Sequence, residues 1–265
     1  MPTCGRLPTA NAVAREIMPP VTDQSYADEH APTAPLPPEL SAAAQRLFGD
    51  RLPLAVEYAE ALATDGVVRG LIGPREAPRL WDRHLLNCAS LTELVPSGAS
   101  VVDVGSGAGL PGIVLAVIRP DLTVALVEPL ARRAVFLSET VARLNLSRVT
   151  VVRARAEDST GLFGSADVVT ARAVAPLDRL TGWCLPLAKV GGRLLAVKGA
   201  SAADEVALYR AAVHRLGGSE PVIRSCGADV LAVPTTVVEV VRSRAVEANR
   251  PAARDRRSGG RRTRG

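Results

Sequence analysis

The chain is poor in cysteine, histidine and aromatic residues. Four cysteines and three histidines are spread over 265 residues. Disulfide frameworks and structural zinc sites need such residues at short, regular spacings, and the sequence has no Cys-x-x-Cys pair. Neither feature is expected, and no metal is predicted. Aromatic residues make up 3% of the chain, too few for a broad platform on which nucleic-acid bases could stack.

Long apolar runs are also missing. The first 20 residues contain Arg6, Arg15, Glu16 and several prolines. A later apolar run, residues 112–118, is far shorter than the roughly 20 residues that cross a bilayer. The sequence therefore predicts a cytoplasmic protein without a membrane segment. Because no heptad pattern is sustained, we expect a monomer.

Charge is distributed unevenly along the chain, whose formal net charge is +5. Residues 1–40 carry two basic and five acidic residues, whereas residues 250–265 carry seven arginines and Asp255. The last segment has too little apolar content to fold alone. Two readings of it stay open: it contacts RNA phosphates, or it is a solubilising tail.

Composition and periodicity divide the chain into four parts. Residues 1–38 are rich in Pro, Ala and Thr and are predicted to be disordered, as is the Arg-rich segment 247–265. From residue 39 to residue 98, apolar residues such as Trp81, Leu85 and Leu86 recur at helical spacing, which predicts a helical N-terminal cap. Residues 99–246 are predicted to form the main α/β domain.

In this domain, short β-branched runs alternate with helical stretches, a pattern typical of a mainly parallel, doubly wound sheet. The final two strands are expected to form an antiparallel hairpin at the sheet edge. Strands are predicted at residues 101–104, 122–127, 149–152, 167–170, 193–197, 220–224 and 236–241, and helices at residues 111–118, 130–144, 176–187 and 202–216.

A glycine-rich turn follows the first predicted strand. Residues 101–112 read VVDVGSGAGLPG, so a buried strand leads through Gly105 and Gly107 into the start of a helix. Glycines let the backbone approach a ligand without an intervening Cβ atom, and this context predicts a nucleotide-type ligand loop. Gly107, Gly109 and Gly112 also satisfy the dinucleotide pattern G-x-G-x-x-G, so an NAD-dependent oxidoreductase is an alternative.

Acidic residues around the turn favour a methyl donor over a dinucleotide. A carboxylate at Asp103 would repel a pyrophosphate, whereas S-adenosylmethionine carries an ammonium and a sulfonium and no phosphate. Glu128, at the end of the second strand, is predicted to accept hydrogen bonds from ribose hydroxyls. Ala156 and Glu157 follow the third strand and are predicted to face the adenine edge.

Several short stretches resemble the ribosomal RNA small subunit methyltransferase G family, also named glucose-inhibited division protein B. The resemblance covers roughly residues 40–242, and Gly-Leu-Pro-Gly after the turn is its most specific part. The similar stretches are Arg83-His84-Leu85-Leu86-Asn87, residues 102–112, Arg132-Arg133-Ala134-Val135-Phe136-Leu137, Arg172-Ala173, Trp183-Cys184 and Val197-Lys198-Gly199.

This resemblance implies a class I, Rossmann-like methyltransferase fold and a defined reaction. The reaction is methylation of N7 of guanine at position 527 of 16S ribosomal RNA, with S-adenosylmethionine as donor and the small ribosomal subunit or an assembly intermediate as partner. The resemblance would place the donor against Gly105, Leu110, Ala156, Glu157 and Arg172. The family's Trp-x-x-x-x-Asn-Leu-Thr stretch is absent, since residues 63–70 read ATDGVVRG, so substrate contacts in the cap stay open.

Guanine N7 carries an in-plane lone pair and no proton, so positioning can supply most of the catalysis. We hypothesise that Arg172 lines the junction between donor and guanine. His84 is a candidate for RNA contact or closure of the donor pocket, and its alternative is a structural role. A non-catalytic RNA-binding protein on a methyltransferase fold is the third reading. Candidate phosphate contacts are Arg132, Arg133, Arg155 and Lys198.

Overall fold

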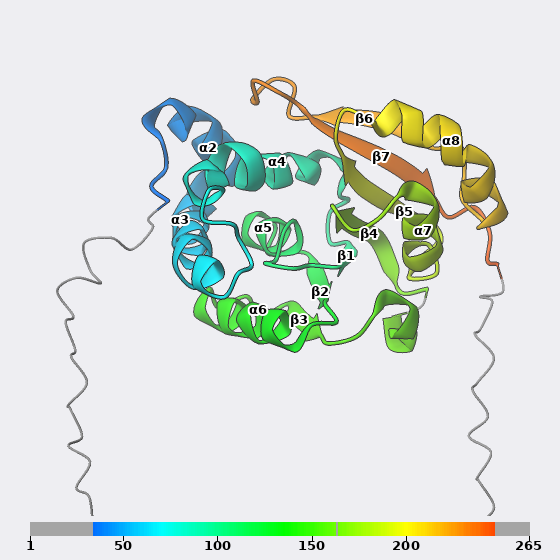
Figure 1. The fold of residues 1–265 in the computed structure, drawn as a ribbon, viewed down its shortest axis with the longest axis horizontal. Helices are drawn as coiled ribbons and strands as arrows, with labels where there is room; N and C mark the ends of the chain where they lie inside the picture. Colours follow the sequence, from blue (N-terminus) through cyan, green and yellow to red (C-terminus); the bar gives the residue numbers. More distant parts are fainter. Residues whose placement is uncertain (1–33, 163, 247–265) are drawn as a thin grey trace, which may run out of the picture. The chain divides into compact units, whose positions relative to one another are not determined.

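The computed structural model of the chain describes residues 34–162 and 164–246 (Figure 1). The predictions for residues 1–33 and for the Arg-rich segment 247–265 lie outside the described residues. No described helix combines the length and apolar composition needed to cross a bilayer.

The predicted cap consists of short α-helices joined by single turns of 3-10 helix and, at Leu62–Gly66 and Trp81–Leu85, of π-helix. The α-helices are α2 (Ser41–Phe48), α3 (Leu52–Ala61) and α4 (Leu86–Ala89). The single turns between and around them are η1 (Pro38–Leu40), η2 (Gly49–Arg51), η3 (Leu62–Gly66), η4 (Ala77–Arg79), η5 (Trp81–Leu85) and η6 (Ser90–Leu94). The helical prediction is confirmed for this segment, whereas residues 70–75 form a loop.

Within residues 34–162 and 164–246, seven strands form one sheet, as the alternation of strands and helices predicts. Their spatial order is β3-β2-β1-β4-β5-β7-β6, and β7 is antiparallel to both β5 and β6. The predicted doubly wound sheet and its edge hairpin are therefore confirmed. The strands are β1 (Ser100–Val104), β2 (Thr123–Val127), β3 (Val149–Val152), β4 (Ala166–Arg172), β5 (Ala188–Lys198), β6 (Val222–Cys226) and β7 (Thr235–Val241).

Helices cover both faces of the sheet (Figure 1). Successive residues of a strand point to opposite faces, so Val101 packs into the core with the cap, α5 (Gly112–Ile118) and α6 (Ala131–Arg143). Val102 instead packs into the core with α7 (Leu177–Cys184) and α8 (Ala202–Arg215). Short 3-10 turns η7 (Ala156–Asp158) and η8 (Thr160–Leu162) connect β3 to β4.

The cap and the sheet share one hydrophobic core. Trp81 packs edge-on against Phe48, with ring centroids 6.1 Å apart, and its indole N–H donates to the carbonyl of Ala34 at 3.0 Å. The same buried cluster continues to Leu115 of α5 and Leu126 of β2. The cap is thus held by the same apolar burial that stabilises the sheet. The division at residue 98 into cap and α/β domain stays a prediction.

Most element boundaries differ from the prediction by one residue or more, among them the starts of β6 and β5 and the end of α7. Strand β6 begins at Val222 rather than at residue 220, because Pro221 has no N–H to give to the sheet. Helix α7 ends at Cys184 rather than at residue 187, because Pro186 cannot bond back to the preceding turn. Strand β5 begins at Ala188 rather than at residue 193 and runs through Gly191 and Gly192.

Candidate functional site

The carboxyl ends of the parallel strands bring the predicted donor residues to one edge of the sheet. Gly105 follows β1, Glu128 follows β2, Ala156 begins the turn after β3, and Arg172 ends β4. Strand β1 lies between β2 and β4, at the point where the order of the parallel strands reverses. Open α/β sheets bind their ligands at this point.

The glycine turn leaves open space at Gly107 and is closely packed at three other glycines, one of which is Gly105, where a Cβ atom would lie 2.9 Å from Val174. Gly105, Gly107 and Gly109 all have positive φ angles, of 66°, 59° and 103°. A Cβ atom at Gly107 would find no heavy atom nearer than 3.8 Å, so a ligand could approach the backbone there. A Cβ atom at Gly109 would collide with Ile113, and one at Gly112 would collide with Leu126. Gly107 therefore suits ligand approach, whereas Gly109 and Gly112 serve packing.

Tyr58 of α3 supports the turn from the cap, a role that the sequence reasoning missed. Its hydroxyl donates to the carbonyl of Ala108 at 2.8 Å, and its side chain is fully buried. The two residues are 50 positions apart in the chain. In the sequence, Tyr58 is one apolar position of a predicted helix, and no local pattern predicts a hydrogen bond to a residue 50 positions away.

Asp103 lies beneath the glycine turn, and its carboxylate is occupied by protein groups. Its two oxygens accept hydrogen bonds from the Thr170 hydroxyl at 2.8 Å and from the Gly112 N–H at 3.2 Å. Burial raises the pKa of this carboxyl to about 6, against the opposing effect of those hydrogen bonds. Asp103 thus ties β1, β4 and α5 together, and its direct contact with a donor stays a prediction.

Glu128 lies beside the turn, at the position predicted for the ribose-binding acid. Its carboxylate is buried and accepts the N–H of Gly107 at 3.0 Å and that of Leu130 at 2.9 Å. Arg133 is 3.8 Å away from it. Glu128 contacts the turn that would hold the donor, and its bonds to ribose stay a prediction.

The other predicted donor contacts differ in their exposure. Ala156 is buried, Glu157 is exposed in η7, and Leu110 is half-buried just after the turn. These positions leave the side chain of Glu157 accessible to a ligand at this edge of the sheet.

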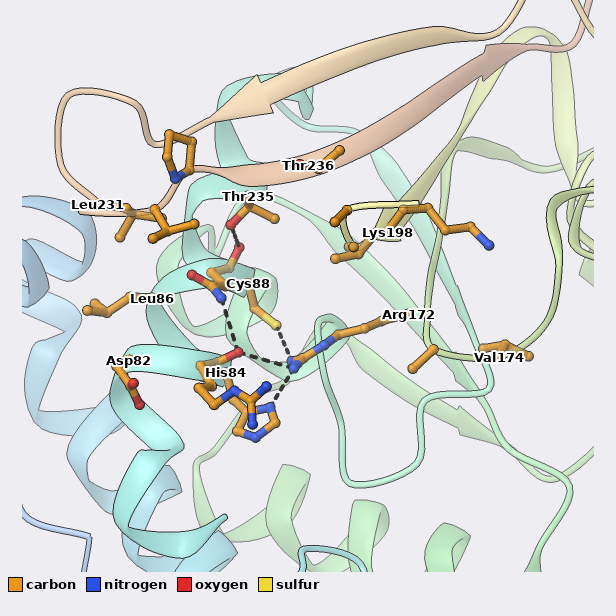
Figure 2. Close-up of a pocket in the computed structure, with 18 of the residues that line it drawn as sticks. Asp82, His84, Leu86, Cys88, Arg172, Val174, Lys198, Leu231, Thr235 and Thr236 are labelled. Carbon is orange, nitrogen blue, oxygen red and sulfur yellow. Dashed lines mark hydrogen bonds between the residues drawn. The ribbon is translucent and has the colours of Figure 1, made fainter. Parts of the chain in front are cut away.

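Arg172 crosses from the end of β4 to the cap, where it is held by three groups (Figure 2). Its Nη1 donates to the Cys88 sulfur at 3.2 Å, and its Nη2 donates to the Arg83 carbonyl at 3.2 Å and to Nδ1 of His84. Two stretches that carry the family resemblance, Arg172-Ala173 and residues 83–87, therefore meet in space.

His84 is neutral in this arrangement, and its two ring nitrogens have different partners. A guanidinium can only donate, so Nδ1 of His84 is the acceptor and the ring proton is on Nε2. Nε2 then donates to Glu76 Oε2 at 3.1 Å. Burial, followed by the nearby charge of Arg172, lowers the pKa of His84. The structure thus places His84 between Glu76 and Arg172, where both of its nitrogens are engaged by protein groups.

Arg172 and His84 line a pocket that the cap, the loop after β4 and the loop between β6 and β7 enclose (Figure 2). Its apolar walls include Leu86, Val197 and Leu231. Lys198 also lines it, but its ammonium donates to the Ala175 carbonyl at 2.9 Å and pairs with Glu205 at 2.7 Å. Apolar walls and paired charges suit a flat, neutral group such as a nucleobase better than a phosphate.

The remaining candidate phosphate contacts do not line this pocket. Arg132 and Arg155 are exposed, near the ends of β2 and β3 respectively, and Arg133 is half-buried beside Glu128. The structure therefore separates the predicted basic residues into Lys198, within the pocket, and three arginines outside it.

Comparisons with known proteins give the family of the chain. A family model described as "GidB: rRNA small subunit methyltransferase G" matches residues 51–232. A protein of Salinispora tropica named "Ribosomal RNA small subunit methyltransferase G" is 63% identical, over 88% of this chain and 98% of its own. A Corynebacterium efficiens protein of the same name is 53% identical, over 80% and 93% respectively.

The fold alone is shared with more distant solved structures. One is a Methanococcus maripaludis protein described as a putative S-adenosyl-L-methionine-dependent methyltransferase, with a TM-score of 0.51 and 14% identity over 72% of this chain and 95% of that one. Since the family model covers more than half of the chain and the sequence relatives are far more than 30% identical, this chain belongs to the rRNA small subunit methyltransferase G (GidB) family.

Proposed function

We propose that this protein, as a cytoplasmic monomer, transfers a methyl group from S-adenosylmethionine to N7 of guanine 527 of 16S rRNA in the small subunit or its assembly intermediate. The observation that carries the proposal is the position of Arg172. It leaves the sheet beside the glycine turn and ends in the pocket lined by the cap. The names of its relatives, ribosomal RNA small subunit methyltransferases, support the class of substrate.

The residues at the sheet edge fit a donor of this kind. The open space above Gly107 allows a close backbone approach, and Glu128 supplies a carboxylate beside the turn for ribose hydroxyls. Ala156 and Glu157 lie at the end of the next strand, where the adenine would be. When bound, S-adenosylmethionine supplies an electrophilic methyl group on its sulfonium. An NAD-dependent oxidoreductase is disfavoured by the family match, which is to methyltransferases.

The pocket around Arg172 fits the guanine base. Guanine N7 needs no proton removed, and the described side chains around Arg172 accordingly act by orientation rather than by acid or base chemistry. The planar guanidinium of Arg172 would hold the base edge or the donor carboxylate. Arg132, Arg133 and Arg155 would contact RNA phosphates outside the pocket.

The proposal is tested by methyl transfer to small subunits isolated from a strain that lacks this gene. Radiolabelled S-adenosylmethionine is supplied, and the modified base is then mapped. Label on N7 of guanine 527 is the expected result. Label on another nucleotide would reject the target, and donor binding without any transfer would support the non-catalytic RNA-binding reading. Gly182→Ala, on α7 and away from the pocket lining, serves as the active control.

A further inference from the structure

The Arg172 guanidinium has to be held in place, because a free arginine side chain samples many rotamers. Within the described residues, its Nη1 and Nη2 groups bond to Cys88, Arg83 and His84, whereas its Nε–H makes no hydrogen bond. The side chain also lines the pocket. The cap thus fixes one end of the fork and leaves N–H capacity for a ligand.

Glu76, in the loop before η4, contacts two of the three residues that hold Arg172. Its Oε2 accepts the Nε2–H of His84 at 3.1 Å, and its Oε1 accepts from Nη1 of Arg83 at 3.1 Å. The Arg83 carbonyl and His84 Nδ1 are in turn acceptors for the same Arg172 nitrogen, Nη2. A single carboxylate therefore orients the His84 ring, one of the two acceptors of that nitrogen, and also pairs with the side chain of Arg83, whose backbone carbonyl is the other.

The hydrogen bonds from Arg172 to His84 and from His84 to Glu76 require one particular tautomer of the His84 ring. Of the two neutral tautomers, only the Nε2–H form leaves Nδ1 free to accept from Arg172, and only that form donates to Glu76. Without the Glu76 carboxylate, the Nδ1–H tautomer would gain population, and in that form Nδ1 would point a proton at the guanidinium. A hydrogen-bonded partner that selects the histidine tautomer is a recurrent device in protein sites.

We propose that Glu76 is a positioning residue for methyl transfer: by fixing the Nε2–H tautomer of His84, it holds Arg172 in the pocket. Glu76 need not touch the donor or the base. This inference rests on the proposed function for its kinetic test, but its structural part is measurable without activity.

The kinetic test is a double-mutant cycle of Glu76→Ala and His84→Ala in the full-length chain, assayed on small subunits. Glu76→Ala is expected to lower kcat/KM roughly tenfold, and to cause little further loss when His84 is already alanine, because one residue acts through the other. Glu76→Gln keeps one acceptor oxygen and should recover part of the loss. Equal losses from Glu76→Ala in both backgrounds would overturn the proposal.

The matched control is Glu57→Ala. Glu57 is a cap carboxylate that is paired with Arg143 at 3.1 Å and is 37% exposed, against 36% for Glu76, and it does not line the pocket. It should leave kcat/KM unchanged. A Glu76→Ala variant that behaves like Glu57→Ala would contradict the proposal. If wild-type protein itself transfers no methyl group, the proposed function fails and the positioning proposal is judged by the spectroscopic test alone.

That test uses ring ¹⁵N NMR of the histidines, of which the chain has three. Wild-type His84 should show one Nε2–H tautomer with two well-separated ring nitrogen signals. Glu76→Ala should move both signals toward a tautomeric average, while Glu57→Ala leaves them in place. A single unchanged tautomer in Glu76→Ala would overturn the proposal, even if that variant lost activity through reduced stability.

Discussion

At the scale of single residues, the glycine turn depends on atoms that approach its backbone closely. Gly112 has an ordinary φ angle, but a Cβ atom there would collide with Leu126 and come within 2.8 Å of Asp103 Oδ2. The glycine is thus required by packing against β1 and β2 rather than by backbone conformation.

Gly112→Ala is expected to lower the free energy of unfolding by about 1–3 kcal/mol, because the added methyl group overpacks the core. Urea unfolding measures it. Gly182→Ala, within α7, is the control. Its Cβ atom would lie 3.8 Å from the Leu216 side chain, an ordinary contact distance, and alanine loses less backbone entropy than glycine in a helix, so that change should be neutral or stabilise by about 0.5–1 kcal/mol. Equal stability of the two variants would contradict the packing argument.

Tyr58→Phe removes the hydroxyl that donates to Ala108 while keeping the buried ring. We expect a loss of about 1 kcal/mol in the free energy of unfolding, as for a typical neutral hydrogen bond. Because the carbonyl belongs to the glycine turn, S-adenosylhomocysteine affinity measured by calorimetry should also fall. A change in stability with unchanged affinity would limit Tyr58 to a role in folding.

Asp103 should give the protein an unusual pH dependence. Burial raises its folded pKa to about 6, above the roughly 3.9 of an unfolded aspartate. Between these pH values the folded state binds the proton more tightly, so the contribution of Asp103 to stability falls as pH rises through about 6. Asp167 works in the opposite sense, since the Ser100 hydroxyl lowers its pKa to about 2. Its contribution is present above the unfolded pKa and is lost on acidification.

The measurement is urea unfolding of the wild type, Asp103→Asn and Asp167→Asn at several pH values from about 2 to 7, a range that spans the folded and unfolded pKa values of both carboxyls. Between about pH 4 and 6, the free energy of unfolding of Asp103→Asn should rise more steeply with pH than that of the wild type. Between about pH 2 and 4, that of Asp167→Asn should rise less steeply than that of the wild type. Curves of unfolding free energy against pH that run parallel for all three proteins would show that neither carboxyl has a shifted pKa.

At the scale of elements, the edge hairpin is joined to the sheet by one buried carboxylate. Glu239 of β7 is 5% exposed and pairs with Arg193 of β5 at 2.8 Å and with Arg224 of β6 at 2.7 Å. Three neighbouring strands therefore share its charge, and β6 is otherwise largely exposed.

Glu239→Ala should lower the free energy of unfolding by about 1.5–3 kcal/mol, the range for hydrogen bonds to charged groups. Amide exchange should quicken most in β6. The surface carboxylate Glu220, 51% exposed and paired with Arg210, provides the comparison. Glu220→Ala should change stability by less than about 0.5 kcal/mol. Uniform exchange across the sheet in Glu239→Ala would contradict a local role.

Periodicity predicts the strands well, because burial on both faces leaves near-continuous β-branched runs such as residues 101–104. It fails where glycine lies inside a strand. Gly192 lies outside the predicted strand 193–197. A Cβ atom there would come within 2.8 Å of the Ala166 carbonyl, so glycine permits β5 to approach β4 at an irregular point of the ladder.

The part of the site predicted to bind the donor can be recognised from the sequence, because the glycine turn and the acidic residues each directly follow a predicted strand. The Arg172 cluster is not. Its partners lie 84 to 89 positions away, and Glu76 shows no motif that distinguishes it from a surface acid. Residues 83–87 are noticeable only through family resemblance, and their contact with Arg172 requires the fold.

At the scale of the whole molecule, the seven arginines of residues 250–265 have two open readings. A chain ending at residue 246 distinguishes them. If the segment contacts RNA phosphates, the slope of log affinity against log salt should become shallower in that shorter chain, by roughly 0.7–0.9 for each phosphate that the arginines neutralise. Filter binding to 16S RNA over a salt series measures it. An unchanged slope would favour the solubilising role.

The shared core of cap and sheet has a consequence for synthesis. The cap emerges from the ribosome first, but the residues that cover its apolar face, such as Leu115 and Leu126, are made later. Arg172 follows His84 by 88 positions. A nascent chain therefore carries an uncovered apolar cap until α5 and β2 have been made, and a product that stops before β4 would contain a complete glycine turn without the arginine that joins it to the cap.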